Sequence, residues 1–371
     1  MNMIQNEKCI LNCSNKKYWN IVKGVGISCI VLGHTNEFFA RFVYLFHLIV
    51  FFFLSGYFYS EKKYGDNLTG LIVERTKKNW IKYVGFSCFF VVIHNILLRK
   101  GLILNGIEFS KKDILINIIN SFFFESTEIM CGALWFIPVQ IFAVILLGFI
   151  IFFSRRINKS YNGSKDIIII IFTVLLGGVG VYFARENEYI HLHVQTSFLV
   201  LPFMMFGYYF RKLTNFDNLL KIVPCIVAFI FLVKCAYIDN NLIELSVNQI
   251  GKLHMFYLIS ILGIYLVLYI SKLIYLSPII SNVFSFFGEH SFEIMASHFF
   301  VIKSIDLIVA KIYSIADSAT YGVFPYAFSN LWPIYLVCSL LLPSLLFKYF
   351  KNIKISSIKN IKISSIFQNE K

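Results

Sequence analysis

The chain has 371 residues, of which 58% are hydrophobic and only 15% are charged, and its mean hydropathy is +0.71. A soluble domain carries roughly 25% charged residues, so this composition excludes an ordinary soluble protein. The formal net charge of +14 does not indicate nucleic-acid binding, because the Lys and Arg residues stand mainly between apolar runs. We therefore interpret the chain as an all-α polytopic membrane protein.

Ten apolar runs follow one another along the chain, and each is interpreted as one membrane-spanning helix, since a crossing needs about 20 apolar residues. The runs lie at 18–39, 43–60, 82–99, 134–153, 166–185, 196–212, 219–237, 253–271, 290–309 and 331–350. The semi-apolar stretches 113–124 and 276–288 are interpreted as interfacial or re-entrant. Three regions result: an N-terminal segment 1–17, a ten-helix membrane domain 18–350 and a basic tail 351–371.

The distribution of basic residues predicts the orientation of these helices. If the N-terminus is cytoplasmic, about two thirds of the 34 Lys and Arg residues fall on the cytoplasmic side, whereas the acidic loops 186–188 and 239–244 fall outside. The first 17 residues are polar and lack a small-residue cleavage site, so we expect no removable signal peptide. These patterns predict a multi-pass protein of the cell membrane with both termini in the cytoplasm.

The eight cysteines are scattered and form no pair of Cys-x-x-Cys motifs. Cys9 and Cys13 are four residues apart, but two thiols alone do not define a metal site. We therefore expect neither a disulfide framework nor a bound metal.

Three ionisable residues, Lys23, His34 and Glu37, interrupt the first apolar run. Lys23 and His34 are eleven residues apart, which places them on one helical face about 16 Å apart along the axis. If the helix continues, Glu37 lies one turn beyond His34 on nearly the same side. Three glycines flank this stripe and allow a close approach by a neighbouring helix or a ligand: Gly24, Gly26 and Gly33.

The stripe has a structural and a functional interpretation. In the first, Lys23 reaches back to the cytoplasmic interface and His34 only bonds another helix. Ionisable groups at membrane depth are costly and normally face a partner or a cavity. Because three of them share one stripe, we favour the functional interpretation, a lined channel.

A basic run, Arg75, Lys77, Lys78 and Lys82, precedes the third apolar segment. By itself it is typical of a solvated cytoplasmic loop. Together with Lys23 it predicts a positively charged mouth for a phosphate-bearing ligand, whose reactive end then reaches His34.

Further polar residues lie in or beside other apolar runs. His47 opens the second run across a short turn from the outer end of the first, and Ser291 and His298 share one face of the ninth. Lys303 and Asp306 have the spacing of a mutually neutralising pair. We expect a structural role for His94, which is alone in the third run.

Several of these residues belong to motifs that resemble the acyltransferase 3 family of membrane-integral acyltransferases, and in particular its fucose 4-O-acetylase-like members. The most specific part is the opening, with Lys23 to Ile27, Val31 to His34, Phe46-His47 and the run from Phe51 to Tyr57. Three weaker features follow in order: Arg75-Thr76-Lys77-Lys78, Leu134-Trp135-Phe136, and Gly288 with Ser291 and His298. The resemblance spans nearly the whole chain.

The resemblance implies a ten-helix enzyme that transfers an acyl group, usually acetyl from cytoplasmic acetyl-CoA, to a hydroxyl of a surface polysaccharide or its lipid-linked precursor. It implies no permanently bound cofactor. It also implies roles for individual residues: His34 as the catalytic histidine; Lys23, Arg75 and Lys78 as acyl-CoA ligands; His47, Trp135, Ser291 and His298 as the surrounding motif shell. Many members have Arg where this chain has Lys23 and Lys78, which weakens the expectation of bidentate phosphate binding.

Two chemical routes fit this assignment. Neutral His34 acts as the general base that takes the proton of the acceptor hydroxyl, with Glu37 fixing its tautomer, or His34 carries the acyl group covalently. A rival interpretation is a transporter or flippase of polysaccharide or lipid-linked sugar without covalent chemistry. The sequence shows no convincing internal repeat of the kind that many transporters have.

Overall fold

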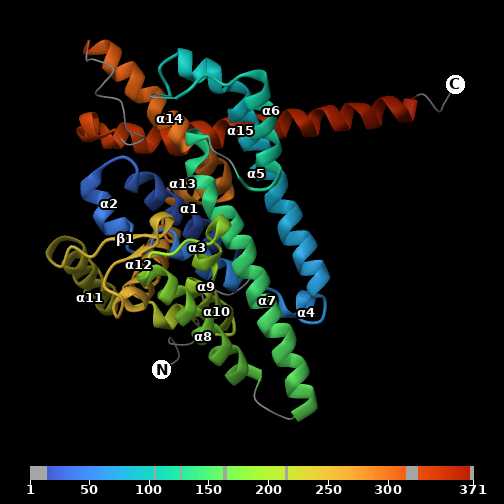
Figure 1. Cartoon of the computed structure of the whole chain (residues 1–371), viewed down its shortest axis with the longest axis vertical. Helices are drawn as coiled ribbons and strands as arrows, with labels where there is room; N and C mark the ends of the chain where they lie inside the picture. Colours follow the sequence, from blue (N-terminus) through green and yellow to red (C-terminus); the bar gives the residue numbers. More distant parts are fainter. Residues whose placement is uncertain are drawn as a thin grey trace, which may run out of the picture.

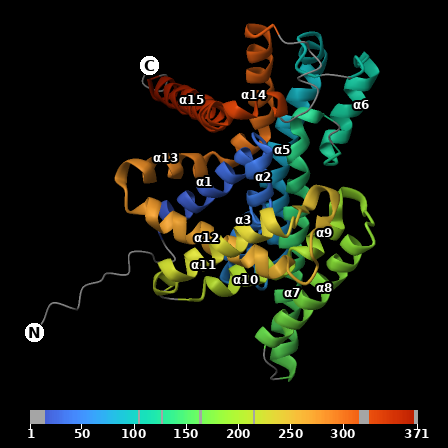
Figure 2. The same cartoon turned by 90° about the vertical axis from the view of Figure 1, so that its left-hand side faces the viewer.

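The computed structural model describes residues 15–103, 106–125, 128–161, 165–213, 216–314 and 325–367. The described part is built almost entirely of helices, and Figures 1 and 2 show their arrangement. The α-helices are α1 (Lys16–Gly33), α2 (Glu37–Val43), α3 (Ile49–Tyr57), α4 (Glu61–Tyr64), α5 (Leu68–Arg99), α6 (Lys111–Phe122), α7 (Phe136–Tyr161), α8 (Lys165–Arg185), α9 (Val194–Leu199), α10 (Leu201–Phe210), α11 (Ile222–Val233), α12 (Phe256–Tyr275), α13 (Pro278–Glu289), α14 (Ser291–Ile312) and α15 (Trp332–Phe367).

Shorter elements connect these helices. Among them are the 3₁₀ turns η1 (Ile129–Trp135), η2 (His191–His193) and η5 (Leu245–Val247). A π-helical turn at Lys234–Ile238 follows α11, and β1 (Ile243–Glu244) pairs antiparallel with β2 (Gln249–Ile250). The hairpin and η5 together cover residues 243–250, and several of these residues line two of the cavities described below.

The all-α prediction is confirmed for the described residues, and five of their helical segments are long and apolar enough to cross a membrane. They are Leu68–Arg99, Ile129–Asn158, Lys165–Arg185, Phe256–Tyr275 and Phe328–Phe350. The count of ten crossings and the cytoplasmic location of both termini stay predictions. Residues 1–14 and 368–371, which belong to the predicted terminal segments, lie outside the described residues.

The first two predicted spans have wrong boundaries. The first helix ends at Gly33 and not near residue 39, because Asn36 caps a new helix: its side chain accepts a hydrogen bond from the Phe38 N–H at 2.8 Å. Inside the second span, α3 has only nine residues. At 1.5 Å per residue it is about 14 Å long, too short for a hydrocarbon core of about 30 Å.

Two later predicted spans are divided as well. The run 196–212 contains α9 and α10, and Pro202 lies in the first turn of the second helix, where the missing N–H costs no hydrogen bond. The run 219–237 contains the 12-residue α11 and the π-helical turn. The stretch 276–288 largely forms α13, which packs along α1. At the other end, α15 continues through position 350, so no backbone break separates the membrane domain from the tail.

Helix α1 lies between α12 and α13, and both views show it side by side with α13 (Figures 1 and 2). Two glycines permit this close contact. A Cβ atom at Gly24 would lie 2.0 Å from the Phe284 carbonyl oxygen, and one at Gly288 would lie 1.8 Å from that of Asn20. The predicted role of Gly24 in close helix packing is thus confirmed.

We expect Gly288→Val to destabilise the protein, because the new side chain forces α13 away from the backbone of α1. Overpacking of this kind costs about 1–3 kcal/mol. The measurement is thermal denaturation of the purified protein in detergent. Gly85→Ala is the matched control, since a Cβ atom there meets nothing within 4 Å. Equal melting temperatures for the two variants would contradict this account of the helix contact.

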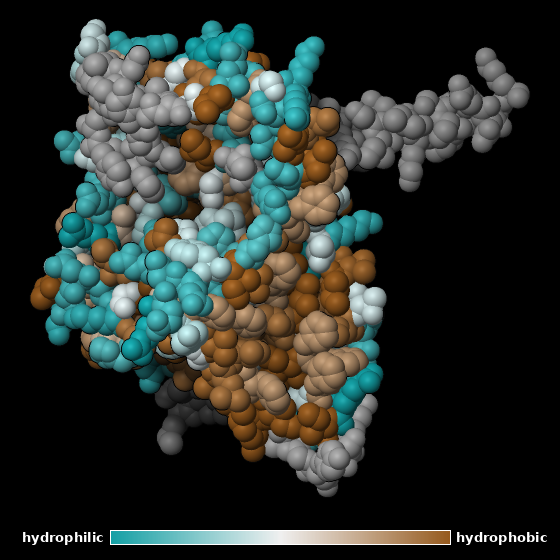
Figure 3. All heavy atoms as spheres, viewed as in Figure 1, coloured by the Kyte–Doolittle hydropathy of each residue, from teal (hydrophilic) through white to brown (hydrophobic). Residues whose placement is uncertain are grey.

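The surface has a broad hydrophobic region over α7 to α10, whereas hydrophilic residues gather over α2 and β1 (Figure 3). Several large apolar side chains of α8 are exposed there, including Ile167, Phe172 and Leu175. Soluble proteins rarely expose contiguous apolar patches of this kind. The surface is therefore that of a protein immersed in lipid.

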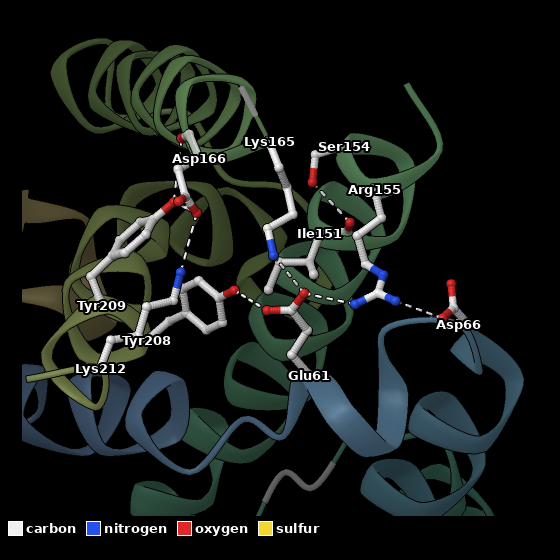
Figure 4. Close-up of polar contacts among 10 residues, drawn as sticks. All are labelled: Glu61, Asp66, Ile151, Ser154, Arg155, Lys165, Asp166, Tyr208, Tyr209 and Lys212. Atoms are coloured by element: carbon white, nitrogen blue, oxygen red, sulfur yellow. Dashed lines mark hydrogen bonds and ion pairs between the residues drawn. The ribbon is translucent and has the colours of Figure 1, made fainter. Parts of the chain in front are cut away.

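An ionic cluster connects α4 to α7, α8 and α10 (Figure 4). The Glu61 carboxylate accepts hydrogen bonds from Arg155 at 2.8 Å, from Lys165 at 2.7 Å and from the Tyr208 hydroxyl. Burial raises the pKa of Glu61, but these hydrogen bonds outweigh it and lower the pKa to about 2. The cluster fixes the segment between α3 and α5, on which one side of the inner cavity depends.

Candidate active site

An inner cavity of about 200 Å³ lies between α1, α3, α5, α7 and α14. It brings together three of the residues predicted to act at the site: Lys23, Arg75 and Ser291. Its remaining walls are largely apolar, and they consist of Ile27, Phe51, Leu54, Ser55, Phe58, Phe136, Ile137, Gln140, Phe292 and Met295. The inner cavity therefore presents two cationic groups on an otherwise largely apolar surface.

The two cations are held at the wall but keep donors for a ligand. Lys23 Nζ donates to Asn20 Oδ1 at 3.1 Å and lies 5.5 Å from the centre of the Phe58 ring. Arg75 Nη2 donates to the Phe58 carbonyl oxygen at 3.4 Å, and Arg75 Nε is buried without a hydrogen-bond partner among the described residues. Helix α14 begins at Ser291 on the same cavity. Cationic side chains at a helix N-terminus form a favourable environment for phosphate groups.

The rest of the basic run does not line the inner cavity. Lys78 is exposed on α5, and its role as an acyl-CoA ligand stays a prediction. Lys82 forms an ion pair with Glu293 at 2.8 Å, so its charge is neutralised locally. Only Arg75 of this run is placed by the structure in the cavity wall.

A second cavity, which we call the outer chamber, has a volume of about 460 Å³ and contains His34, His47 and Trp135 in its wall. The segments that form it are the C-terminal end of α1, the turn before α3, η1, the hairpin and α14. The other lining residues are Ile30, Tyr44, Leu48, Ile129, Gly132, Ala133, Glu244, Ser246, Val247, Met295 and Phe299. Residues of three predicted motifs therefore line one space, and Trp135 comes from a distant part of the chain.

Four rings form two stacked pairs beside this chamber, and the pairs meet edge to face at His34 and Tyr44. The His298 ring lies on His34 with centroids 5.2 Å apart, and the Tyr44 ring lies on His47 with centroids 4.6 Å apart. The Tyr44 hydroxyl connects the two pairs through a 3.1 Å hydrogen bond with His34 Nδ1. Gly33 leaves room for this tyrosine, because a Cβ atom there would lie 2.5 Å from its ring.

Hydrogen bonds to the backbone determine the tautomers of His47 and His298. His47 Nδ1 lies 3.0 Å from the Val43 carbonyl oxygen, and His298 Nδ1 lies 2.8 Å from that of Met295. A carbonyl accepts only, so Nδ1 carries the proton and Nε2 is the acceptor in each neutral ring. His298 Nε2 is buried and has no hydrogen-bond partner among the described residues. This unsatisfied acceptor belongs to the ring that is stacked on His34.

The expected placement of Glu37 beside His34 is wrong. The two residues do not share a helical face, because α1 ends at Gly33 and Glu37 begins α2. The Glu37 carboxylate is 64% exposed and forms an ion pair with Arg41 at 3.2 Å. The structure places Tyr44, instead of an acidic group, at the Nδ1 atom of His34.

The inner cavity and the outer chamber meet at Met295, which lines both. Helix α1 contributes Lys23 and Ile27 to the inner cavity, and it contributes Ile30 and its C-cap residue His34 to the outer chamber. The two spaces therefore share one flexible side chain in their walls, that of Met295.

Three residues that line the site were not predicted from the sequence: Tyr44, Glu244 and Met295. Tyr44 precedes His47 by three residues, so the motif around His47 contained a pattern that pointed to it. No local pattern marks Glu244 or Met295, because both reach the site only through packing of distant segments.

The other predicted polar residues lie outside these cavities. His94 Nδ1 is 2.6 Å from Glu128 Oε2 and its ring lies on Phe109 with centroids 3.6 Å apart, as expected for a structural role. Lys303 and Asp306 are paired at 3.7 Å. Within the described ranges, no group of three or more His, Cys, Asp or Glu residues is arranged to hold a metal ion.

Comparison with known proteins gives one match. A family model described as an acyltransferase domain matches residues 16–356, nearly the whole chain. No curated protein sequence and no solved structure matches the chain.

Proposed function

Because the chain belongs to the acyltransferase 3 family and is a multi-pass membrane acyltransferase, we propose that it is an O-acetyltransferase of the cell membrane. In this proposal it moves acetyl from cytoplasmic acetyl-CoA to a hydroxyl of a surface polysaccharide or of its lipid-linked precursor. The observation that supports it best is that the cationic inner cavity and the outer chamber of His34 both lie against α1 and share Met295 in their walls.

The donor binds with its phosphates at the inner cavity. Lys23 and Arg75 neutralise phosphate charge there, and the N-terminus of α14 adds its partial positive charge. The thioester end of the extended donor passes between apolar walls towards the outer chamber. Lys23 and His34 are eleven residues apart on one helix, which corresponds to about 16 Å.

His34 acts on the acceptor hydroxyl in the outer chamber. An alcohol is a poor nucleophile at neutral pH, so the neutral imidazole takes its proton as the new ester C–O bond forms. The thioester C–S bond then breaks, and the proton passes to the departing CoA sulfur. The hydrogen bond between Tyr44 and His34 Nδ1 orients the ring for this step. In the alternative route, His34 accepts the acyl group first and releases it to the acceptor.

The test uses membranes from cells that express the protein, supplied with acetyl-CoA labelled in the acetyl group. We expect label in the carbohydrate fraction with the wild type and only background with His34→Ala. If both proteins move carbohydrate across the membrane and neither transfers label, the transporter interpretation replaces this one. Label on the protein itself, formed without acceptor and absent in His34→Ala, distinguishes the covalent route from direct transfer.

Removing either cation of the inner cavity is expected to raise the KM for acetyl-CoA. Lys23→Ala and Arg75→Ala each delete a charge-assisted contact, and such contacts contribute about 1.5–3 kcal/mol, which corresponds to roughly tenfold or more in KM. Lys77→Ala is the control, since it removes one charge from an exposed position of the same basic run. A KM that changes equally in all three variants would show that only the overall charge of this side matters.

A further inference from the structure

A third cavity, which we call the vestibule, adjoins the outer chamber and has a volume of about 500 Å³. Helix α2 forms one wall, and the segment from the π-helical turn to the hairpin forms the other. The polar lining residues are Glu37, Arg41, Tyr44, Asn240, Glu244 and Gln249. A contact between Tyr237 and Phe38 holds the walls together, since the Tyr237 hydroxyl donates to the Phe38 carbonyl oxygen at 2.8 Å and the two rings stack.

The vestibule shares part of its wall with the outer chamber, in which the proposed catalytic histidine lies. Tyr44 and Glu244 line both the vestibule and the outer chamber, and the Tyr44 hydroxyl is hydrogen-bonded to His34. A molecule held in the vestibule therefore borders the space in which His34 lies. This end of the path is separated from the inner cavity by the whole outer chamber.

The hairpin is built to present polar groups to the vestibule. Glu244 and Gln249 are paired across the two strands, and paired residues point to the same face of a sheet. The neighbouring pair, Ile243 and Ile250, is 2% and 5% exposed and anchors the hairpin, and Ile243 also contributes to the vestibule wall. Asn248 occupies the turn with φ +56°, and its side-chain amide donates to the Glu188 carbonyl oxygen at 2.6 Å.

The charges of the vestibule differ from those of the inner cavity. Arg41 is neutralised by Glu37 at 3.2 Å, and Glu244 adds a further carboxylate. The vestibule therefore has no excess positive charge with which to hold the phosphates of a CoA donor. Burial raises the pKa of Glu244, and hydrogen bonds from the Ser246 side chain and backbone oppose this rise. Because burial removes water from this carboxylate, hydroxyl groups of a ligand can replace the lost hydrogen bonds.

We propose that the vestibule is the acceptor-binding site, in which Glu244 and Gln249 accept and donate hydrogen bonds to carbohydrate hydroxyls and direct one of them past Tyr44 to His34. This inference rests on the proposed function. It assigns donor and acceptor to opposite ends of one path: acyl-CoA at the inner cavity and the polyhydroxyl acceptor at the vestibule. Amide and carboxylate side chains are the groups that pair with several hydroxyls at once.

The experiment measures how efficiently released CoA is coupled to acetylation. Membranes that contain the natural acceptor are supplied with labelled acetyl-CoA, and the label in carbohydrate is divided by the CoA released. Gln249→Trp adds bulk at a residue that lines the vestibule and not the outer chamber, and Glu244→Gln removes a charge with little change in shape. We expect each variant to lower this ratio at least tenfold, because acetyl then passes to water instead of carbohydrate.

Two controls match the variants in bulk and in charge. Leu253→Trp adds an indole beside the hairpin, and Glu186→Gln removes an exposed carboxylate from another loop; neither residue lines the vestibule. A ratio within twofold of the wild type for Gln249→Trp, or an equal fall in the controls, overturns the assignment of the acceptor site. A wild type that neither releases CoA nor labels carbohydrate overturns the proposed function, and this inference with it.

Discussion

Replacing His34 with alanine is expected to lower the rate of acyl transfer by about 10²–10⁴-fold, the usual contribution of a general base. The same variant loses the acyl carrier if the covalent route operates, so both routes predict a large loss. The KM for acetyl-CoA is expected to change little, because the proposed phosphate ligands, Lys23 of α1 and Arg75 of α5, line the inner cavity and not the chamber of His34. The measurement is the initial rate of label transfer from acetyl-CoA at saturating donor.

His254→Ala is the matched control for this prediction, because His254 is exposed and lies outside the three cavities. His34→Ala must also retain the melting temperature of the wild type to within a few degrees, so that lost activity is not lost folding. A folded His34→Ala protein with more than a tenth of the wild-type rate would remove this histidine from the chemistry.

Enlarging Met295 is expected to have the second largest effect. This side chain is 7% exposed and lines both the inner cavity and the outer chamber. Met295→Trp places a rigid indole where the thioester has to pass, so we expect acyl transfer to fall by about 10–100-fold. The effect is expected in kcat more than in KM, because the phosphates still bind at the inner cavity while the reactive end is held back.

Met295→Leu is the control for this prediction. It conserves volume and apolar character, which core positions usually tolerate, and we expect its rate to stay within about threefold of the wild type. Melting temperatures measured for both variants separate blockage from unfolding. A stable Met295→Trp protein with wild-type kcat would show that the donor reaches His34 by another path.

The helical nature of the chain could be predicted because it depends on local properties, namely the length and apolarity of each run. The run 166–185, for example, corresponds closely to α8 (Lys165–Arg185). Helix ends were predicted less well, since they depend on single residues. Asn36 starts α2 three residues after Gly33, and the apolar pattern alone continues through this boundary.

The candidate site was predictable where its residues share one helix or one motif. Lys23 and His34 are related by helical spacing, and Ser291 and His298 by seven residues of α14. The structure places Lys23 and Ser291 in the wall of the inner cavity. It places His34 in the wall of the outer chamber, with His298 stacked on it. The pairing of Glu37 with His34 failed because it required an unbroken helix. Tyr44 takes the position at Nδ1 instead.

The sequence by itself indicated that this protein is helical and polytopic, that it resembles an acyltransferase family, and that Lys23 and His34 have the spacing of one helical face. These properties follow from composition, periodicity and motifs, which are local in the chain. Only the tertiary structure decided that Met295 lines both the inner cavity and the outer chamber and that Glu244 lines the chamber of His34. Such contacts join segments some 200 residues or more apart, and they arise from how helices and a hairpin pack, which no local pattern records.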